Sequence, residues 1–164
     1  MKYLNDRHVI WLVLLRIAIG WHFLYEGLVK VIDGNWSARA YLLDSRGPLS
    51  SLFHSMASNE RILSVTDFLN EWGLLLIGLG LVLGILSRWA SYAGMVMLLF
   101  YYLSHPPFPG ITYSMPTEGN YFIIDKVAIE FFALGLLSLF PTEYIAGVAR
   151  FFRRKDQEIG RAHV

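Results

Sequence analysis

The chain has 164 residues, of which 55% are hydrophobic and only 16% are charged, and its mean hydropathy is +0.44. Soluble domains usually carry about 25% charged residues, so this composition favours one small integral membrane domain over residues 1–164. The formal net charge of +1 argues against a nucleic-acid partner, since such proteins usually gather basic residues on one face. Cysteine is absent, which excludes disulfides and thiolate chemistry, and we expect no metal or iron–sulfur centre.

The first predicted span, residues 9–32, is long enough to cross a bilayer, whose apolar core needs about 20 helical residues. It also carries Arg16, His22, Glu26 and Lys30, the last three spaced by four and therefore on one helix stripe. A central Arg or Lys facing lipid costs about 2.5–3.5 kcal/mol, so this stripe must face protein or water. A cleaved signal peptide is the alternative, but the run lacks an Ala-x-Ala-like site and is interrupted by Arg16, so we expect a retained span.

The segment that follows, residues 33–70, is too polar to span a membrane and begins with a turn signal at Asp33-Gly34-Asn35. It contains three stretches with apolar residues at helical spacing, and Pro48 and Ser58-Asn59 stand where helices can start. We therefore expect short interfacial helices that form an outer cap between the first two spans. A plain loop is the alternative, although about 35 structureless residues would be unusual in a compact domain.

Three further spans are predicted from apolar runs, with a tight turn at Ser87-Arg88 between the second and the third. They cover residues 71–87, 89–104 and 121–140 and are followed by a basic tail at 145–164. Residues 105–120 hold four of the six prolines and form a loop that cannot be helical throughout. Lys and Arg are most frequent near both termini and at Arg88, so the positive-inside rule places both ends in the cytoplasm and the cap and proline loop outside. The predicted fold is an all-α bundle of four transmembrane helices.

The first and fourth spans run in opposite directions in this topology, so the depth of each charge predicts its partner. Arg16 is expected to form a structural ion pair with Glu130 near the middle of the membrane. A second group of charges is expected in the outer half of the bundle, comprising Glu26, Lys30, Asp125 and Lys126. This arrangement predicts a polar pocket between the two spans, open toward the outer face.

These ionisable residues have two interpretations, which the sequence leaves open. The charges can serve packing alone, since intramembrane ion pairs are often positional. In the functional interpretation, Glu26, Lys30 and Asp125 are catalytic, and His22, Lys126 and His105 bind a cofactor. His22 can equally be a hydrogen-bonded core residue, and His105 is placed on the outer face by the proline loop.

The run LRIAIGWHFLYEGLVKV at residues 15–31 resembles the opening of DoxX-like membrane proteins, in which an Arg, two Gly and a Lys recur at the positions of Arg16, Gly20, Gly27 and Lys30. The four-span plan, the turn at Ser87-Arg88 and the His-Pro pair at residues 105–106 are similar to that family as well. The resemblance implies a four-helix bundle of the bacterial inner membrane, related to the DoxD subunit of thiosulfate:quinone oxidoreductase. Related proteins that handle thiols carry Cys pairs, and this chain has none.

Two functions from different classes follow from these observations. The first is a quinone-interacting subunit of a membrane oxidoreductase, in which Lys30 or His22 hydrogen-bonds a ring carbonyl and Glu26 or Asp125 relays protons. The second is a non-enzymatic subunit whose cap and proline loop dock an extracytoplasmic partner. A transporter has little support, because no inverted repeat or broken pair of spans is visible. Whether the chain forms a homo-oligomer is left open.

Overall fold

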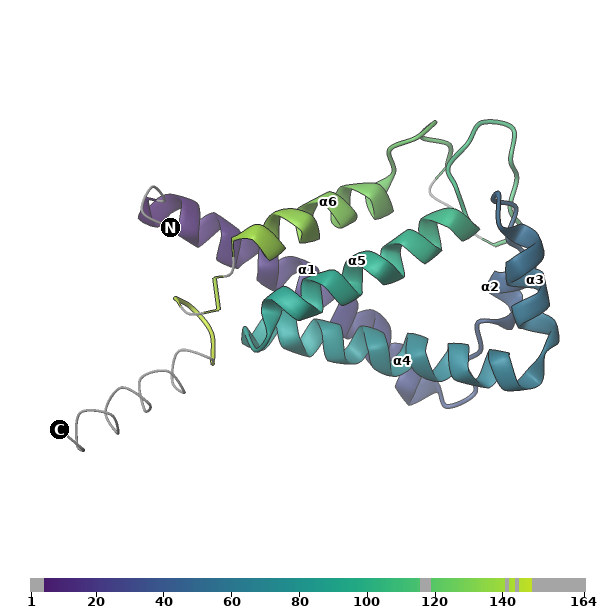
Figure 1. Ribbon diagram of the computed structural model, residues 1–164, viewed down its shortest axis with the longest axis horizontal. Helices are drawn as coiled ribbons and strands as arrows, with labels where there is room; N and C mark the ends of the chain where they lie inside the picture. The colour runs from purple at the N-terminus through teal and green to yellow at the C-terminus, as the bar shows by residue number, and fades with distance from the viewer. Residues whose placement is uncertain (1–4, 116–118, 141, 144, 149–164) are drawn as a thin grey trace.

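The protein is described by a computed structural model that covers residues 5–115, 119–140, 142–143 and 145–148. Most of the predicted basic tail, residues 149–164, lies outside the described residues. The described chain is all-α, as predicted (Figure 1). Its helices are α1 (Asp6–Asp33), α2 (Arg39–Leu43), α3 (Ser50–Ser58), α4 (Glu60–Leu83), α5 (Ser87–Ser104) and α6 (Lys126–Leu139).

Helix α1 corresponds to the first predicted span, extended by three residues at its start. The side chain of Asn5 caps its N-terminus, and Gly34, with a φ of 65°, ends it in the left-handed conformation that favours glycine. The predicted turn at Asp33-Gly34-Asn35 is therefore the C-terminal cap of this helix.

Helix α4 differs from its predicted bounds. The second span was expected to begin at residue 71, with a separate short helix before it, but α4 is continuous from Glu60. Asn59 caps it by accepting hydrogen bonds from the backbone N–H groups of Arg61 and Ile62. No proline separates the polar first part of α4 from its apolar second part, and the helix continues through Gly73 at their boundary.

The turn between α4 and α5 lies three residues earlier than predicted. Gly84 and Leu86 both have positive φ angles, and Ser87 and Arg88 are already the first residues of α5. Helix α6 begins at Lys126 rather than at residue 121, because Asp125 caps it and Phe122 has a φ of 67°, which a helix excludes.

The four long helices lie side by side, and successive ones run in opposite directions (Figure 1). Helix α1 packs along α4, α4 on α5 and α5 on α6, while α6 meets α1 over a shorter stretch, so the four form a closed ring. Helices α2 and α3 cover one end of the bundle, as expected for a cap, and the N-terminus lies at the opposite end. A core lies between the long helices, and a second, smaller core joins the cap to the start of α4.

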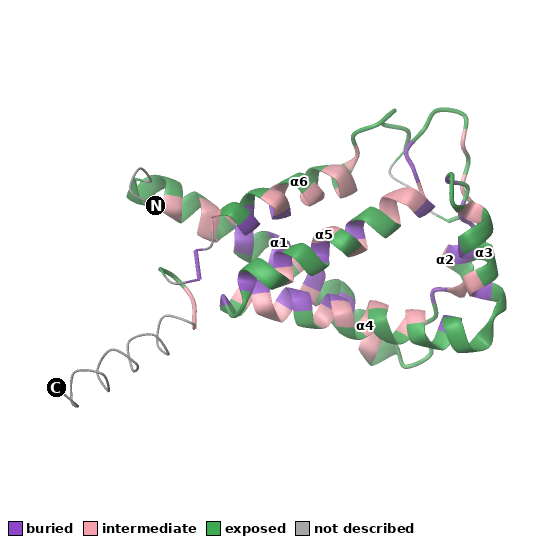
Figure 2. Cartoon of the chain, in the orientation of Figure 1, coloured by how far each residue is buried: buried purple, intermediate pink, exposed green. Residues whose placement is uncertain are grey.

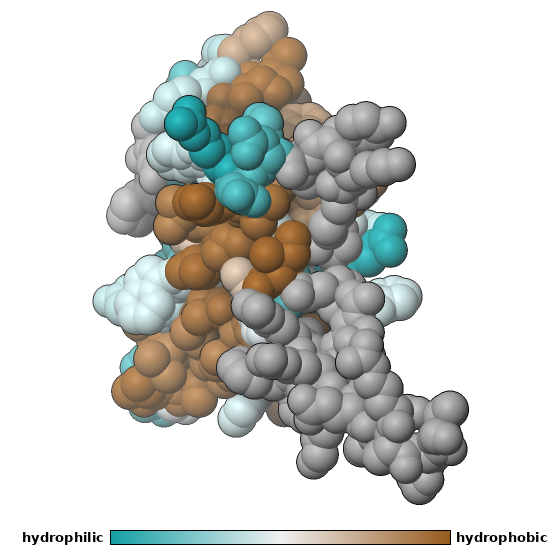
Figure 3. All heavy atoms as spheres, turned by 90° about the vertical axis from the view of Figure 1, so that its left-hand side faces the viewer, coloured by the Kyte–Doolittle hydropathy of each residue, from teal (hydrophilic) through white to brown (hydrophobic). Residues whose placement is uncertain are grey.

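Many large hydrophobic residues of the long helices are exposed. Along each of these helices, buried residues alternate with exposed ones (Figure 2). Seen from the end that carries the N-terminus, much of the described surface is also hydrophobic (Figure 3). By length and composition, α1 and α4 are each apolar enough to cross a bilayer. Helices α5 and α6 have 18 and 14 residues, or about 27 and 21 Å at 1.5 Å per residue. The four-span topology therefore remains a prediction.

Candidate functional site

A pocket of about 380 Å³ lies between α1 and α6 and reaches α4, α5 and the cap. Its volume is within the usual range for small-molecule sites, about 300–1,000 Å³. Its polar lining consists of His22, Glu26, Lys30, Ser37, Asn70, Tyr101, Lys126 and Glu130, and its apolar lining of Phe23, Trp36, Ala38, Tyr41, Leu74, Leu98, Met115 and Val127. Ionisable residues from the first and last long helices thus face one cavity, which we call the α1–α6 pocket.

The α1 wall of this pocket is the stripe of residues spaced by four. Lys30 Nζ lies 3.5 Å from Glu26 Oε2 and 4.9 Å from the centre of the Trp36 ring. The Lys30 side chain is only 16% exposed, whereas half of the Glu26 side chain is exposed. The ammonium group is therefore held between a carboxylate and an aromatic face, which is a typical cation–π arrangement. It keeps further hydrogen-bond donors for a ligand.

His22 and Glu130 connect α1 to α6 across the pocket. Nδ1 of His22 donates a hydrogen bond to Oε1 of Glu130 over 2.6 Å. Helices α1 and α6 pack against each other over a shorter stretch than the other neighbouring long helices do. The His22–Glu130 contact joins the bundle at this place. A carboxylate hydrogen-bonded to an imidazole is an arrangement that can take up and release a proton near neutral pH.

The α6 end of the pocket is formed by Lys126, while Asp125 has a structural contact. One carboxylate oxygen of Asp125 accepts a hydrogen bond of 2.9 Å from the backbone N–H of Ala128, which caps α6. Asp125 and His105 do not line the α1–α6 pocket but a neighbouring cavity, also of about 380 Å³. The two cavities share five lining residues, which are Tyr41, Tyr101, Met115, Lys126 and Val127.

Two residues of the pocket were not anticipated from the sequence. Oδ1 of Asn70 and the hydroxyl group of Tyr101 are buried, and neither forms a hydrogen bond of good geometry among the described residues. Asn70 is on α4 and Tyr101 on α5, so they face the pocket from the side opposite the charged helices. Nothing in the sequence distinguishes them from other polar residues at helix surfaces, because their significance comes from the packing around them.

Arg16 does not pair with Glu130, and the predicted ion pair is wrong. Its guanidinium group donates hydrogen bonds to Thr142 Oγ1, over 2.9 Å, and to the carbonyl oxygen of Ala146. The partners lie after α6, one before the predicted tail and one within its first residues, and this part of the chain folds back onto the α4–α5 turn. Val148 N–H donates to the carbonyl of Leu83 there.

Glu143 completes this inner contact. Its carboxylate accepts hydrogen bonds from the backbone N–H of Ser87, over 2.6 Å, and from the Ser87 hydroxyl, over 2.5 Å. A carboxylate at the first turn of α5 also interacts favourably with the helix dipole. Arg16 and Glu143 are 2% and 7% exposed, respectively, so these contacts are structural and separate from the pocket.

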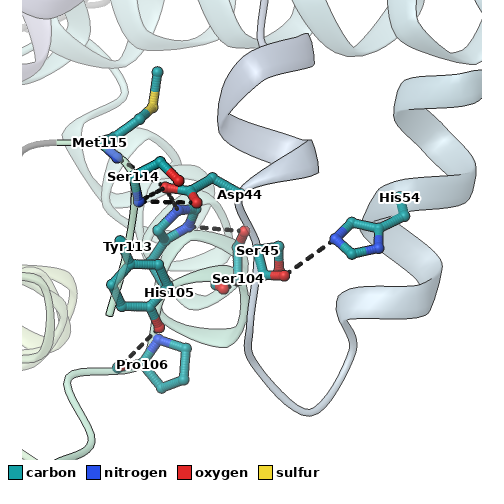
Figure 4. Close-up of polar contacts among 9 residues, drawn as sticks. All are labelled: Asp44, Ser45, His54, Ser104, His105, Pro106, Tyr113, Ser114 and Met115. Atoms are coloured by element: carbon teal, nitrogen blue, oxygen red, sulfur yellow. Dashed lines mark hydrogen bonds and ion pairs between the residues drawn. The ribbon is translucent and has the colours of Figure 1, made fainter. Parts of the chain in front are cut away.

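A second cluster of polar contacts joins the cap to the proline loop (Figure 4). Asp44 accepts hydrogen bonds from the backbone N–H groups of Ser114 and Met115, at distances of 2.8–3.0 Å. The His105 ring is stacked between Tyr41 and Tyr113, with ring centres 3.9 and 4.6 Å away. Because Met115 also lines the α1–α6 pocket, this cluster fixes one part of the pocket wall.

The charges of this second cluster depend on its hydrogen bonds and its burial. The hydrogen bonds from Ser114 and Met115 hold the pKa of Asp44 below its usual value, which keeps the carboxylate charged. Burial lowers the pKa of His105, an effect that the nearby Asp44 carboxylate opposes. His105 Nε2 is 4.0 Å from Asp44 Oδ2 and has no hydrogen-bond partner among the described residues. Burial therefore favours the neutral form of His105.

Comparisons with known proteins identify a family and nothing more specific. The sequence model of the DoxX family matches residues 11–106, which cover most of α1 and all of α2 to α5. The match includes the stripe residues His22, Glu26 and Lys30 and the aromatic face of Trp36. Neither a curated protein nor a solved structure matches the chain. Among the described residues, no three His, Asp or Glu side chains lie close enough together to hold a metal ion.

Proposed function

The chain belongs to the DoxX family of membrane proteins, and from this premise we propose that it is a quinone-interacting subunit of a membrane oxidoreductase. The observation that carries the proposal is the α1–α6 pocket. It combines hydrogen-bond donors, carboxylates and aromatic walls within one cavity between the first and last long helices. A quinone head group is flat and apolar on its faces and accepts hydrogen bonds at its two ring oxygens, so it is complementary to such a lining.

The donors of the pocket suit the ring oxygens. Lys30, held by Glu26 and Trp36, is positioned to donate to one oxygen, and Lys126 lines the same cavity from the start of α6. The faces of the ring would lie against Phe23, Trp36 and Leu74. This division into polar ends and apolar faces is what orients a planar ligand in a pocket.

Reduction of a quinone takes up two electrons and two protons. Glu26 is half exposed and lies beside Lys30, so it can collect a proton from water and pass it toward the pocket. The His22–Glu130 pair offers a second proton at the opposite end. Asp125, which caps α6, and His105, which is stacked behind Tyr41, support the wall of the pocket rather than contact the ring in this proposal.

We place the protein in a bacterial cytoplasmic membrane with both termini in the cytoplasm. Helices α1, α4, α5 and α6 would be the four spans, and the cap and the proline loop would face outward. The pocket is then in the outer half of the bundle. An extracytoplasmic partner subunit that docks on the cap and the loop would supply the electrons.

Quinone binding to the purified full-length protein tests this proposal. We expect decylubiquinone to raise the midpoint temperature of thermal unfolding, since a ligand that binds only the folded state stabilises it. Lys30→Met should weaken the binding at least tenfold, because it removes a donor and keeps the apolar stem. Arg39→Met is the matched control: Arg39 pairs with Glu60 outside the α1–α6 pocket, at 2.6 Å, so this variant should bind normally.

The opposite results are equally informative. If wild-type protein shows no saturable quinone binding and purifies with a stable protein partner, the proposal is wrong and the alternative, a non-enzymatic subunit, is favoured. If Lys30→Met and Arg39→Met bind alike, the pocket is not the binding site.

A further inference from the structure

The unpartnered polar atoms on the α4–α5 side of the pocket point to the form of the ligand that it binds best. We propose that Asn70 and Tyr101 together recognise one hydroxyl group of the reduced ligand, so that the pocket binds a hydroquinone more tightly than the quinone. This inference rests on the proposed function and adds the redox state of the ligand to it.

The two atoms are costly for the protein to leave unpaired. Most buried polar atoms in native proteins have a hydrogen-bond partner, so each exception requires an explanation. The Asn70 side chain lies close enough to the Tyr101 hydroxyl to act on it as a hydrogen-bonding neighbour. Even so, neither Oδ1 of Asn70 nor the Tyr101 oxygen forms a hydrogen bond of good geometry among the described residues. Both atoms lie on the wall of the same cavity, which is where a ligand would satisfy them.

Oδ1 of Asn70 and the Tyr101 hydroxyl differ in hydrogen-bonding capacity, and this difference favours a ligand hydroxyl over a ligand carbonyl. Oδ1 of Asn70 can only accept a hydrogen bond, whereas the Tyr101 hydroxyl can donate one. A ligand hydroxyl group satisfies both, because it donates its proton to Asn70 and accepts the proton of Tyr101. A carbonyl oxygen satisfies Tyr101 alone and leaves Oδ1 of Asn70 unpaired.

The charges around this wall favour a neutral hydroxyl over an ionised one. Glu26 is near enough to Tyr101 to interact with it electrostatically, so it would repel an oxyanion placed between Asn70 and Tyr101. Elsewhere, the lining of the pocket offers both donors, at Lys30 and His22, and acceptors, at Glu26 and Glu130. These groups accept either redox form, and the preference arises at Asn70.

Selective binding of the reduced form has a thermodynamic consequence. If the hydroquinone binds tenfold more tightly than the quinone, the midpoint potential of the bound couple rises by about 30 mV, because two electrons are transferred. The pocket would then favour acceptance of electrons by the bound quinone.

The experiment compares decylubiquinone with decylubiquinol under anaerobic conditions, using full-length protein in detergent and quenching of tryptophan fluorescence. We expect wild-type protein to bind decylubiquinol at least tenfold more tightly. Asn70→Leu should abolish this preference by weakening decylubiquinol binding. Tyr101→Phe should weaken the binding of both forms, since both accept its proton. Neither variant should unfold at a lower temperature than wild type without ligand, because each removes an unpaired polar atom.

Tyr102→Phe is the matched control on the same helix. The Tyr102 hydroxyl donates to the carbonyl of Ile123 over 2.7 Å and does not line the pocket, so this variant should keep the wild-type preference. Equal binding of both forms by wild type, or an unchanged preference in Asn70→Leu, would overturn this inference and leave the proposed function in place. Absence of binding of either form would overturn both.

Discussion

The close approach of α1 and α4 depends on glycine, and Gly78→Ala is the substitution that tests it most sharply. A Cβ atom at Gly78 would lie 2.3 Å from the backbone nitrogen of Leu24 and 2.5 Å from its Cα. Ordinary contacts begin near 3.4 Å, so the two backbones must separate by about 1 Å. No side chain can move aside to relieve this overlap, because the atoms in contact belong to the backbone of α1.

The expected cost can be worked out from two opposing effects. Overpacking a close-packed site costs about 1–3 kcal/mol, and the upper part of this range applies where backbone must move. Alanine is a better helix former than glycine by about 1 kcal/mol, which offsets part of the cost. We therefore expect Gly78→Ala to lower the free energy of unfolding by about 2 kcal/mol. For a chain of this length that corresponds to about 4–8 °C in Tm.

Gly73→Ala is the control, since it lies on the same helix and has space for a Cβ atom. Its nearest neighbour would be the sulfur of Met97, at 3.4 Å, in a flexible side chain. This variant should be as stable as wild type or slightly more stable, owing to the gain in helix propensity. Thermal unfolding of the three proteins in one detergent, followed by tryptophan fluorescence, measures the difference. Equal Tm values for Gly78→Ala and Gly73→Ala would refute the packing of α1 against α4 described above.

Three further predictions concern the polar clusters at the two ends of the bundle. Asp44→Asn should lower the free energy of unfolding by about 1.5–3 kcal/mol, measured by thermal unfolding, because it weakens charge-assisted hydrogen bonds to the proline loop. His105→Gln should reduce the loss of stability on acidification. The pKa of His105 is lowered in the folded state, so wild type loses stability as the pH falls from the unfolded value, about 6.5, toward the folded one. The difference in Tm between wild type and this variant should thus shrink below pH 6.5, and a constant difference would contradict the neutral form of His105. Glu143→Gln should destabilise the protein by about 1.5–3 kcal/mol, since it weakens the cap on Ser87, without changing the affinity for decylubiquinone.

The helical class and the charged pocket were accessible from the sequence because they follow from hydrophobic periodicity. The spacing of His22, Glu26 and Lys30 by four residues places them on one stripe, and the cost of charges in lipid requires that stripe to face inward. The structure brings this stripe, together with Lys126 and Glu130, to one cavity. The predicted opposite directions of the first and last long helices were enough to place these charges at similar depths, and hence in one pocket.

The hydrogen-bond partners of individual charged residues could not be predicted from the sequence in the same way. The pairing of Arg16 with Glu130 was inferred from their matching depths in the first and fourth spans, which says nothing about the segment after Phe140. In the structure, residues 142–143 and 145–148 lie near Gly84, and Arg16 donates its hydrogen bonds to Thr142 and Ala146 there. A chain reversal of this kind is decided by close packing, as Gly84 shows: a Cβ atom there would lie 2.8 Å from Gly147 Cα. Helix periodicity carries no information about such a contact.

The central claim of this account is that a quinone head group binds between α1 and α6. An experimental density map of the full-length protein, prepared with decylubiquinol, tests it most directly. The account predicts a flat density in the α1–α6 pocket, with one oxygen beside Lys30 and the other within hydrogen-bonding distance of Asn70 and Tyr101. A map with ligand density elsewhere and only acyl chains in that pocket would contradict it.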